Sequence, residues 1–286
     1  MDKETHIGII LNTSKEEAIR STHKIVDLLK KAGLEYFLLR EEAMKCDLSR
    51  VGLEKEDFLK KISYLLTIGG DGTLLRGARL VGGKNIPILG INMGRMGFLT
   101  QTNLENFPDL IPLLKENKFS LERRKGLITE IKGETIFSLN DSVILRKNPF
   151  RIIELKVSIN GEYLTTFSAD GLIVSTPTGS TAHSLSAGGP ILHPEVEGII
   201  IIPICPHTLS HRPLVIPSSS SIEVLSLSPG GVSVVCDGQM GKDVEMEVPI
   251  IIENSSFDTL LLRFTKSDFY SLLRKKLNWK GHSGKE

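Results

Sequence analysis

The sequence has few cysteines and no long apolar run. Its three cysteines, Cys46, Cys205 and Cys236, are odd in number and far apart. They form neither a disulfide framework nor the CxxC pairs of a zinc site, and they fit a reducing compartment, so we expect a cytoplasmic protein. No stretch of about 18 apolar residues is present, so no transmembrane helix is expected. The apolar segment near the N-terminus is too short for a secretory signal peptide.

A charge imbalance is also absent. The 35 Lys and Arg residues nearly balance the 34 Asp and Glu residues, so nothing indicates a nucleic-acid-binding surface. The composition, 40% hydrophobic and 24% charged, is ordinary for a soluble globular protein. A chain of 286 residues is long enough for one large domain or two moderate ones with a sizeable core. We therefore expect no nucleic acid and no membrane among its partners.

The most informative stretch is residues 65–73, LLTIGGDGT. An apolar run ends abruptly in a glycine-rich turn, and apolar residues at helical spacing follow it. This pattern predicts a strand, a tight turn and the start of a helix. Glycines let backbone N–H groups approach a ligand, and the N-terminus of a helix favours anions. The turn is therefore a candidate phosphate-binding site.

Asp71 is unexpected in such a turn, because a carboxylate among phosphate-binding amides repels phosphate unless it has its own function. The two candidate functions are accepting a proton from an attacking hydroxyl and holding a metal ion. The motif is not a P-loop, because no Lys-Ser/Thr follows, and its spacing differs from GxGxxG. Since Gly-Gly-Asp-Gly also forms ordinary turns, the motif alone leaves a purely structural role open.

Residues 1–120 alternate between strand patterns (6–11, 34–39, 62–68 and 86–91) and helical patterns. Ser14 and Glu17 predict a capping box at the start of the first helix, and Gly33 predicts its end. The alternation predicts a Rossmann-like parallel α/β sheet, which binds ligands at the carboxyl ends of its strands. The glycine turn and a second glycine-bearing loop, residues 92–98, both follow strands. They should therefore line one crevice.

The pattern changes near residues 119–125. Short segments rich in β-branched residues continue to about residue 264 and predict an all-β, sandwich-like domain. Asn160 and Gly161 predict a hairpin turn within it. The tail, residues 267–277, is helical again. We therefore predict an α/β domain over residues 1–120 together with 266–286, and an all-β domain over residues 121–265.

Two stretches of the predicted all-β half carry candidate binding groups. Asn140 and Asp141 interrupt an apolar segment, which costs stability unless they form a bulge, a turn or a site. Residues 168–190 combine a second Asp-Gly pair, at Asp170, with many hydroxyls and glycines, which suits a ligand with phosphate or ribose groups. A flexible loop is the alternative, but apolar residues in the same stretch favour an ordered segment.

The histidines and arginines are less decisive. His207 and His211 are four residues apart, as on a zinc-binding helix, but prolines flank them and no HExxH glutamate lies between them. A structural or interface role is therefore expected, whereas His183 lies inside the polar stretch. Three arginines are candidate phosphate contacts, with a solvated surface position as the alternative: Arg76, Arg95 and Arg151.

Taken together, the motifs resemble those of the bacterial NAD kinase family. The resemblance depends on GGDGT at 69–73, NMGRMGFLT at 92–100, the pair Asn140 and Asp141, and DGLIVSTPTGSTAHSLSAGGP at 170–190. PHTLSHRPLVIP at 206–217 and CDGQ at 236–239 extend it. GGDG alone is shared with diacylglycerol, sphingosine and 6-phosphofructokinases, but the long 170–190 stretch is far more specific. The resemblance covers almost the whole chain, in order.

The resemblance implies that the γ-phosphoryl group of ATP is transferred to the 2′-hydroxyl of the adenosine ribose of NAD, giving NADP. It implies a divalent cation, Mg²⁺, held mainly by the nucleotide phosphates, and no metal ligand from the protein. It also implies that Asp71 orients and deprotonates the hydroxyl and that phosphate lies against Gly70, Gly72 and Thr73.

The resemblance further implies a set of nucleotide-binding residues. The adenosine contacts would be Phe98, Asn140, Asp141, Thr181, Ala182, His183 and Ser186. Asp170 would contact the ribose or amide on the nicotinamide side. The other members of the set are Arg76, Arg151, Ser168, Ser184, Leu185, Cys205 and Gln239. A neighbouring subunit would complete the pocket around Cys205 and His207, which implies a homotetramer, or at least a dimer.

Three positions depart from the family's usual residues. The family usually has Glu at the position of Asp141, often Tyr at that of His183 and often a basic residue at that of Ser168. These departures leave affinity and the choice between NAD and NADH open. Two other functions also remain open at this point. A GGDGT lipid kinase would need a membrane-facing surface, and the sequence shows no basic amphipathic helix. A non-catalytic dinucleotide sensor would not need Asp71.

Overall fold

The computed structural model describes residues 5–94, 96–100, 102–208, 210–264 and 269–279. By the contacts between its residues, the chain divides into two compact units. Unit 1 comprises Met1–Leu74, Ile86–Glu122 and Leu261–Glu286, and unit 2 comprises Leu75–Asn85 and Arg123–Leu260. The sequence predicted boundaries at residues 120 and 265 and placed all of residues 75–85 in the first domain. Residues 75–85 join unit 2 because Arg79 hydrogen-bonds Gln239 and Gly83 lies against Phe257.

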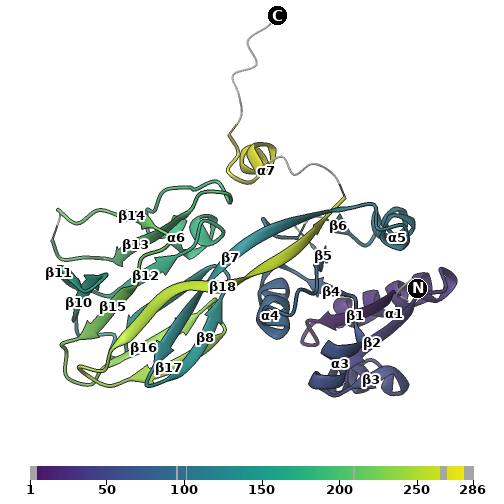
Figure 1. Cartoon of the computed structure of the whole chain (residues 1–286), viewed down its shortest axis with the longest axis horizontal. Helices are drawn as coiled ribbons and strands as arrows, with labels where there is room; N and C mark the ends of the chain where they lie inside the picture. Colours follow the sequence, from purple (N-terminus) through teal and green to yellow (C-terminus); the bar gives the residue numbers. More distant parts are fainter. Residues whose placement is uncertain (1–4, 95, 101, 209, 265–268, 280–286) are drawn as a thin grey trace, which may run out of the picture. The chain divides into compact units, whose positions relative to one another are not determined.

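Unit 1 is an α/β domain (Figure 1). Its strands are β1 (His6–Leu11), β2 (Glu35–Leu39), β3 (Gly52–Leu53), β4 (Tyr64–Gly69), β5 (Ile88–Asn92) and β6 (Thr102–Asn103). Its helices are α1 (Glu16–Lys31), α2 (Arg40–Lys45), α3 (Lys55–Lys61), α5 (Phe107–Lys115) and α7 (Phe269–Lys276), with a 3-10 turn η1 (Ser49–Val51). The helix α4 (Asp71–Val81) begins in unit 1 and continues into unit 2.

The sheet of unit 1 is parallel, as predicted. Its order is β5-β4-β1-β2-β3, and the end of β18 (Ile250–Arg263) pairs with β5. The helices α1 and α5 cover one face, where Ile25 and Phe107 are fully buried in the same cluster as the strands. On the other face, a Cβ added to Gly8 would lie 2.8 Å from Phe58 of α3. Because both faces are covered, β4 is buried along its whole length, which explains its continuous apolar sequence.

The ends of α1 test two sequence predictions. The predicted capping box of Ser14 and Glu17 is wrong: no described side chain caps the helix, and the Ser14 N–H donates to Asn12 Oδ1 at 3.1 Å. A local turn at Asn12 therefore competes with the cap. The predicted end at Gly33 is confirmed, because Gly33 has a φ of +69°, the left-handed conformation that follows many helices.

Apart from the part of α4 that it contains, unit 2 is mainly β, as predicted. Its first sheet is antiparallel and has the order β14-β13-β12-β9-β16-β17. These strands are β9 (Asp141–Arg146), β12 (Gly171–Ser175), β13 (Gly198–Ile204), β14 (Leu214–Pro217), β16 (Val232–Cys236) and β17 (Met240–Val244). The other strands are β7 (Ser120–Ile131), β8 (Glu134–Ser138), β10 (Ile153–Ile159), β11 (Glu162–Ala169), β15 (Ile222–Ser226) and β18. Two short helical pieces, η2 (Gly179–Thr181) and α6 (His183–Ser186), follow β12.

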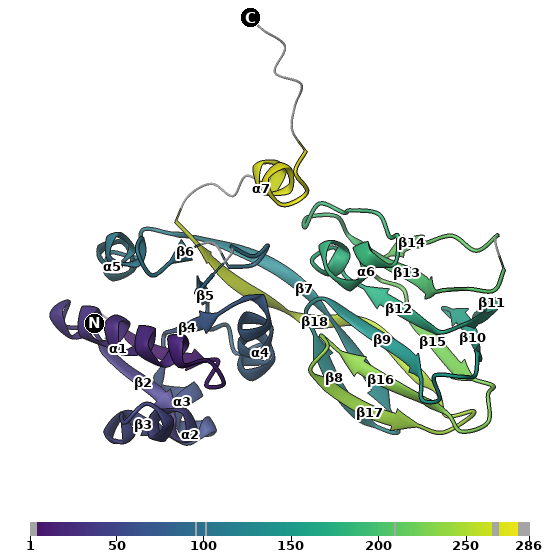
Figure 2. The same cartoon turned by 180° about the vertical axis from the view of Figure 1, so that it is seen from behind.

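The two layers of unit 2 pack on one hydrophobic core. Ile144 and Val174 of the first sheet share a fully buried cluster with Leu155 and Val224 of β10 and β15. Residues on the other face of β9, β12 and β13, including Ile173, form a second cluster. These three strands lie side by side (Figure 2) and are buried on both faces. The arrangement is a β-sandwich.

The predicted hairpin at Asn160 and Gly161 is confirmed. Both residues have a positive φ, +50° and +82°, as a type I′ turn requires. They connect Ile159 to Glu162, which pair in antiparallel strands. In the described ranges, no helix has both the length and the apolar composition needed to cross a membrane.

Candidate active site

Asp71 is the first residue of α4, directly after the turn that ends β4. Its carboxylate accepts hydrogen bonds from three consecutive backbone N–H groups: Phe98 at 2.8 Å, Leu99 at 3.3 Å and Thr100 at 3.1 Å. The Thr100 hydroxyl donates a further bond at 3.0 Å. The carboxylate therefore holds the loop that follows β5 against the start of α4.

Glycines in β5 and in this loop allow that approach. A Cβ added to Gly97 would lie 1.9 Å from Asp71 Oδ1, and one added to Gly90 would lie 2.7 Å from Thr100 Cγ2. Only glycine fits at such distances. The two glycine-bearing loops that the sequence singled out therefore meet at the carboxyl ends of β4 and β5, where Gly69 pairs with Asn92.

The glycine turn itself exposes its backbone. Gly70 and Gly72 are exposed, and a Cβ added to Gly70 would meet no atom of the described residues within 4 Å. Thr73 is buried, and its N–H donates to the Gly70 carbonyl at 3.0 Å. Open backbone before a helix of 11 residues suits an anion. Arg76 is half-buried on the same helix, and Arg95 lies outside the described residues.

A cavity of about 520 Å³ also opens at the carboxyl end of β5. It is lined by Asn92, Met93 and Gly94 of the second loop, by residues 103–105, and by Arg20 and Lys24 of α1. Gly70 and Gly72 are not among its lining residues, so only one of the two predicted loops borders this cavity.

In unit 2, the Asn140–Asp141 turn is held by a residue that was not among the predicted site residues. The Asp237 carboxylate accepts hydrogen bonds from the N–H groups of Leu139, Asn140 and Asp141, at 3.0, 2.8 and 3.4 Å. Its own N–H donates to the Asp141 carbonyl at 3.0 Å. The CDGQ motif contained Asp237, but an Asp-Gly pair between two strands signals only a hairpin turn.

The carbonyl side of the same turn is held by the segment after β12. The Thr176 hydroxyl donates to the Leu139 carbonyl at 2.7 Å, and the Thr176 N–H donates to the Asn140 carbonyl at 2.9 Å. A Cβ added to Gly179 would lie 2.2 Å from the Asn140 carbonyl oxygen. The structure therefore brings the Asn140–Asp141 pair next to the start of the 175–186 segment, two stretches that the sequence identified separately.

Two predicted binding residues carry buried polar atoms without a partner. Asn140 Oδ1 and Ser184 Oγ are buried and accept or donate no hydrogen bond within the described part of the chain. Leaving a buried polar group unpaired costs about 1–3 kcal/mol, so such atoms are candidates for hydrogen bonds to a ligand. Of the neighbouring predicted residues, Thr181, Ala182 and Leu185 are half-buried, and His183 and Ser186 are exposed.

Asp141 and Asp237 form a buried pair of carboxyl groups, only 4% and 7% exposed. Burial raises the pKa of Asp141 to about 7, and the charge of Asp237 acts in the same direction. Burial also raises the pKa of Asp237, whereas its three amide hydrogen bonds and the Arg79 guanidinium oppose that shift. Arg79 donates to the exposed Gln239 side chain at 2.5 Å, and its Nη1 is buried without a partner among the described residues.

A second group of predicted residues meets at the opposite end of β12. Asp170 forms an ion pair with Arg146 at 2.8 Å, and its N–H donates to the Ile204 carbonyl. The His207 N–H donates to the half-buried Ser168 at 2.9 Å, and Cys205 is exposed. Since β9 rises about 3.3 Å per residue, this group lies about 17 Å from the Asp141 end of the sheet.

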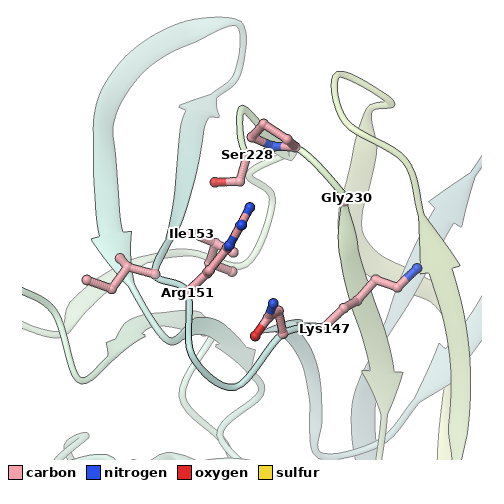
Figure 3. Close-up of a pocket in the computed structure, with 9 residues that line it drawn as sticks. Lys147, Arg151, Ile153, Ser228 and Gly230 are labelled. Atoms are coloured by element: carbon pink, nitrogen blue, oxygen red, sulfur yellow. The ribbon is translucent and has the colours of Figure 1, made fainter.

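Arg151 lies in neither group. It is exposed on the connection between β9 and β10, beyond the Arg146 end of β9, and lines a cavity of about 360 Å³ (Figure 3). Its guanidinium points toward Ser228, with Gly230 nearby, whereas Lys147 pairs with Asp243 at 2.8 Å. The structure therefore does not bring Arg151 together with Asn140 and Asp141.

Comparison with known proteins decides the family. Residues 7–119 match the family described as ATP-NAD kinase N-terminal domain, and residues 139–264 match the ATP-NAD kinase C-terminal domain. The chain belongs to the NAD kinase family. The resemblance that the motifs indicated is thereby confirmed.

Similar proteins cover nearly the whole chain. The NAD kinase of Desulforamulus reducens is 35% identical over 277 residues, 95% of this chain and 96% of the relative. That of Geobacter sp. (strain M21) is 38% identical over 284 residues, 96% and 98% of the two chains. Among solved structures, an NAD kinase from Archaeoglobus fulgidus in complex with ATP is 27% identical with a TM-score of 0.78, covering 97% and 100%. Yeast NADH kinase complexed with NADH has a TM-score of 0.89 at 24% identity, covering 100% and 91%, a likeness of fold.

The protein is therefore an NAD⁺ kinase, a phosphotransferase that acts on an alcohol group. It transfers the γ-phosphoryl group of ATP to the 2′-hydroxyl of the adenosine ribose of NAD and produces NADP. Such a reaction needs a base for the hydroxyl, a cradle for phosphate and a binding site for adenosine.

Proposed function

We propose that Asp71 is the general base of this reaction, which orients and deprotonates the 2′-hydroxyl. The observation that carries the proposal is the position of its carboxylate, at the end of a buried strand beside exposed glycine amides. Backbone amides of residues 98–100 fix the carboxylate in place. Because a carboxylate has about four lone-pair sites, the incoming hydroxyl must share or displace one of these donors.

Phosphate would lie against Gly70, Gly72 and Thr73, with Arg76 as a further contact. The exposed backbone at the start of α4 supports this assignment. No group of three His, Cys, Asp or Glu residues in the described ranges is arranged to hold a metal ion. We therefore propose that a divalent cation, Mg²⁺, is held mainly by the nucleotide phosphates, where it neutralises charge on the transferred group.

The adenosine would be bound by the polar turn and the segment after β12. The unpartnered Asn140 Oδ1 and Ser184 Oγ support this proposal, because adenosine offers both donors and acceptors to such atoms. The exposed imidazole of His183 is available to stack on the base. The proposed adenosine contacts in unit 2 are Asn140, Asp141, Thr181, Ala182, His183 and Ser186, with Ser184 as a further binding residue.

The nicotinamide half would lie toward Asp170, Ser168 and Cys205. Their grouping at one end of β12 supports a shared role. A neighbouring subunit would complete this part of the pocket around Cys205 and His207, both exposed in the single chain, which makes a homotetramer the proposed assembly. The proposed location is the cytoplasm, where NAD and ATP are available.

The test is an assay of purified protein with ATP, Mg²⁺ and NAD, in which NADP is measured with an NADP-specific dehydrogenase. We expect NADP from the wild-type protein and almost none from Asp71→Asn, with circular dichroism unchanged. NADP formation by Asp71→Asn at the wild-type rate would contradict the role of Asp71. Sedimentation velocity in the same buffer tests the tetramer.

A further inference from the structure

We infer that Asp237 is a positioning residue for the NAD site: its carboxylate fixes the backbone of residues 139–141 and so aims Asn140 and Asp141 at the ribose. The inference rests on the proposed binding role of those two residues. Asp237 is separated from Asn140 by 97 residues in the sequence. It would not itself touch the nucleotide.

The turn needs an acceptor because it lies between two strands. β8 ends at Ser138 and β9 begins at Asp141, so the amides between them have no place in a regular ladder. Buried backbone N–H groups must find a partner, and one carboxylate serves three of them in a row. A carboxylate suits this task because it accepts hydrogen bonds at both oxygens and donates none.

The backbone of the turn is thereby held from two sides. Asp237 binds its amides, and the Thr176 hydroxyl and amide bind its carbonyls. The buried Oδ1 of the Asn140 side chain accepts no hydrogen bond from any described residue. The backbone groups of the turn are therefore hydrogen-bonded within the protein, and the Asn140 side chain remains available to bind a ligand.

The backbone of Asp237 suggests a simpler alternative. Asp237 and Gly238 have positive φ values, +52° and +64°, so Asp237 could be present only because Asp tolerates a left-handed turn. Asn tolerates the same conformation. The variant Asp237→Asn therefore keeps the turn and the side-chain volume but replaces one acceptor oxygen with a donor that faces backbone amides.

The charges around the pair give a second readout. The ionisable groups that interact here are Asp141 on β9, Cys236 and Asp237 at the end of β16, and Arg79 on α4. Three amides and Arg79 favour the ionised form of Asp237, whereas no such group among the described residues favours that of Asp141. Asp141 therefore retains its proton more readily, with a pKa of about 7. Removing the negative charge of Asp237 lowers the pKa of Asp141 and moves its titration to more acidic pH.

The experiment compares wild type, Asp237→Asn and Asp237→Gly in steady-state kinetics between pH 5.5 and 9. We expect the KM for NAD to rise at least tenfold in both variants, with the KM for ATP within twofold of wild type. We also expect the pH dependence of the KM for NAD to shift to lower pH in Asp237→Asn. Asp243→Asn, on the exposed face of the same hairpin, is the matched control and should change neither value.

Two outcomes for Asp237 would overturn the inference, and a third, for Asn140, would overturn the site on which it rests. One is a folded Asp237→Asn with an unchanged KM for NAD and an unchanged pH profile. Another is that neither variant folds, which would make Asp237 a requirement of the fold. Asn140→Ala, measured in parallel, separates this failure from that of the proposed site. If Asn140→Ala leaves the KM for NAD unchanged, the adenosine site itself is wrong; if it raises KM while Asp237→Asn does not, only the role of Asp237 fails.

Discussion

Gly97 and Asp71 approach each other so closely that a Cβ on Gly97 would lie 1.9 Å from Asp71 Oδ1. The carboxylate uses this space to bind the amides of residues 98–100. The two glycine-bearing loops of unit 1 are therefore joined by hydrogen bonds. The first loop supplies the carboxylate, and the second supplies the N–H donors that orient it.

Gly97→Ala should disturb the contact between the Asp71 carboxylate and the loop that contains Gly97. Overpacking of a tight contact costs about 1–3 kcal/mol, and we expect a loss of that size in the free energy of unfolding together with reduced NADP formation. Gly94→Ala in the same loop is the control, because a Cβ there would meet no atom within 4 Å in the part of the chain that the structure describes. Urea denaturation and the NADP assay measure the two effects. If the two variants have the same free energy of unfolding, the loop accommodates the added Cβ without loss of stability and the prediction is wrong.

Asp71→Asn removes the proposed base with little change of shape. General base catalysis contributes about 10²–10⁴-fold to a rate, so kcat should fall within that range. Asn also brings a donor against the amides of residues 98–100, which should lower stability slightly. The exposed Asp57 of α3 provides the control Asp57→Asn, for which wild-type kcat is expected. A loss of less than tenfold in Asp71→Asn would leave Asp71 with a supporting role only.

Gly179→Ala should act on substrate binding rather than on turnover. Its Cβ would lie 2.2 Å from the Asn140 carbonyl oxygen, so the polar turn must move. We expect the KM for NAD to increase about tenfold, which corresponds to about 1.4 kcal/mol of lost binding. Gly241→Ala, whose Cβ would have ordinary contacts beyond 3.5 Å, should behave as wild type. The prediction fails if both alanine variants have the same KM for NAD.

The buried Asp141 predicts a specific dependence of stability on pH. Its pKa is about 7 in the folded protein and 3.8 as the ordinary value, so between these values the folded state holds a proton that the unfolded state has lost. Stability therefore falls as pH rises through this window, by about 1.4 kcal/mol per pH unit, and levels off above pH 7. Below pH 4 both states are protonated, and the effect vanishes.

Asp141→Asn removes this titration. The difference in unfolding free energy between Asp141→Asn and wild type should shift in favour of the variant from pH 4 to 7 and then stay constant. Any fixed cost of burying the amide does not change with pH, so the slope is the diagnostic quantity. Urea denaturation at four pH values measures it, and parallel curves for the two proteins would refute a raised pKa.

Much of the architecture was predictable because it depends on local pattern. The apolar run before Gly69 predicted a strand, and alternating segments predicted the parallel sheet. Asn160 and Gly161 predicted their own hairpin, since a type I′ turn requires two residues that tolerate positive φ. The capping box at Ser14 failed because Asn12 offers a competing local hydrogen bond, and sequence spacing does not rank such competitors.

The candidate site was predictable only in part. Asn140 and Asp141 were recognised as out of place in an apolar segment, and Asp71 as out of place among glycines. The partner Asp237 was not recognised, because it reaches residue 140 through the pairing of β9 with β16. The pocket around Arg151 was likewise hidden, because two connections far apart in sequence form it.

By itself, the amino-acid sequence established the main structural elements and the family. It predicted a glycine turn that carries a carboxylate and a sandwich of short strands, and its motifs identified an NAD kinase. Each of these is encoded within a few consecutive residues, where backbone conformation and side-chain period suffice. Sheet register alone decided which buried acid would support the polar turn, which amide oxygen would be left without a partner, and which carboxyl group would keep its proton. Those properties depend on burial and on the neighbours that a residue has across strands. Neither can be predicted from a short stretch of sequence.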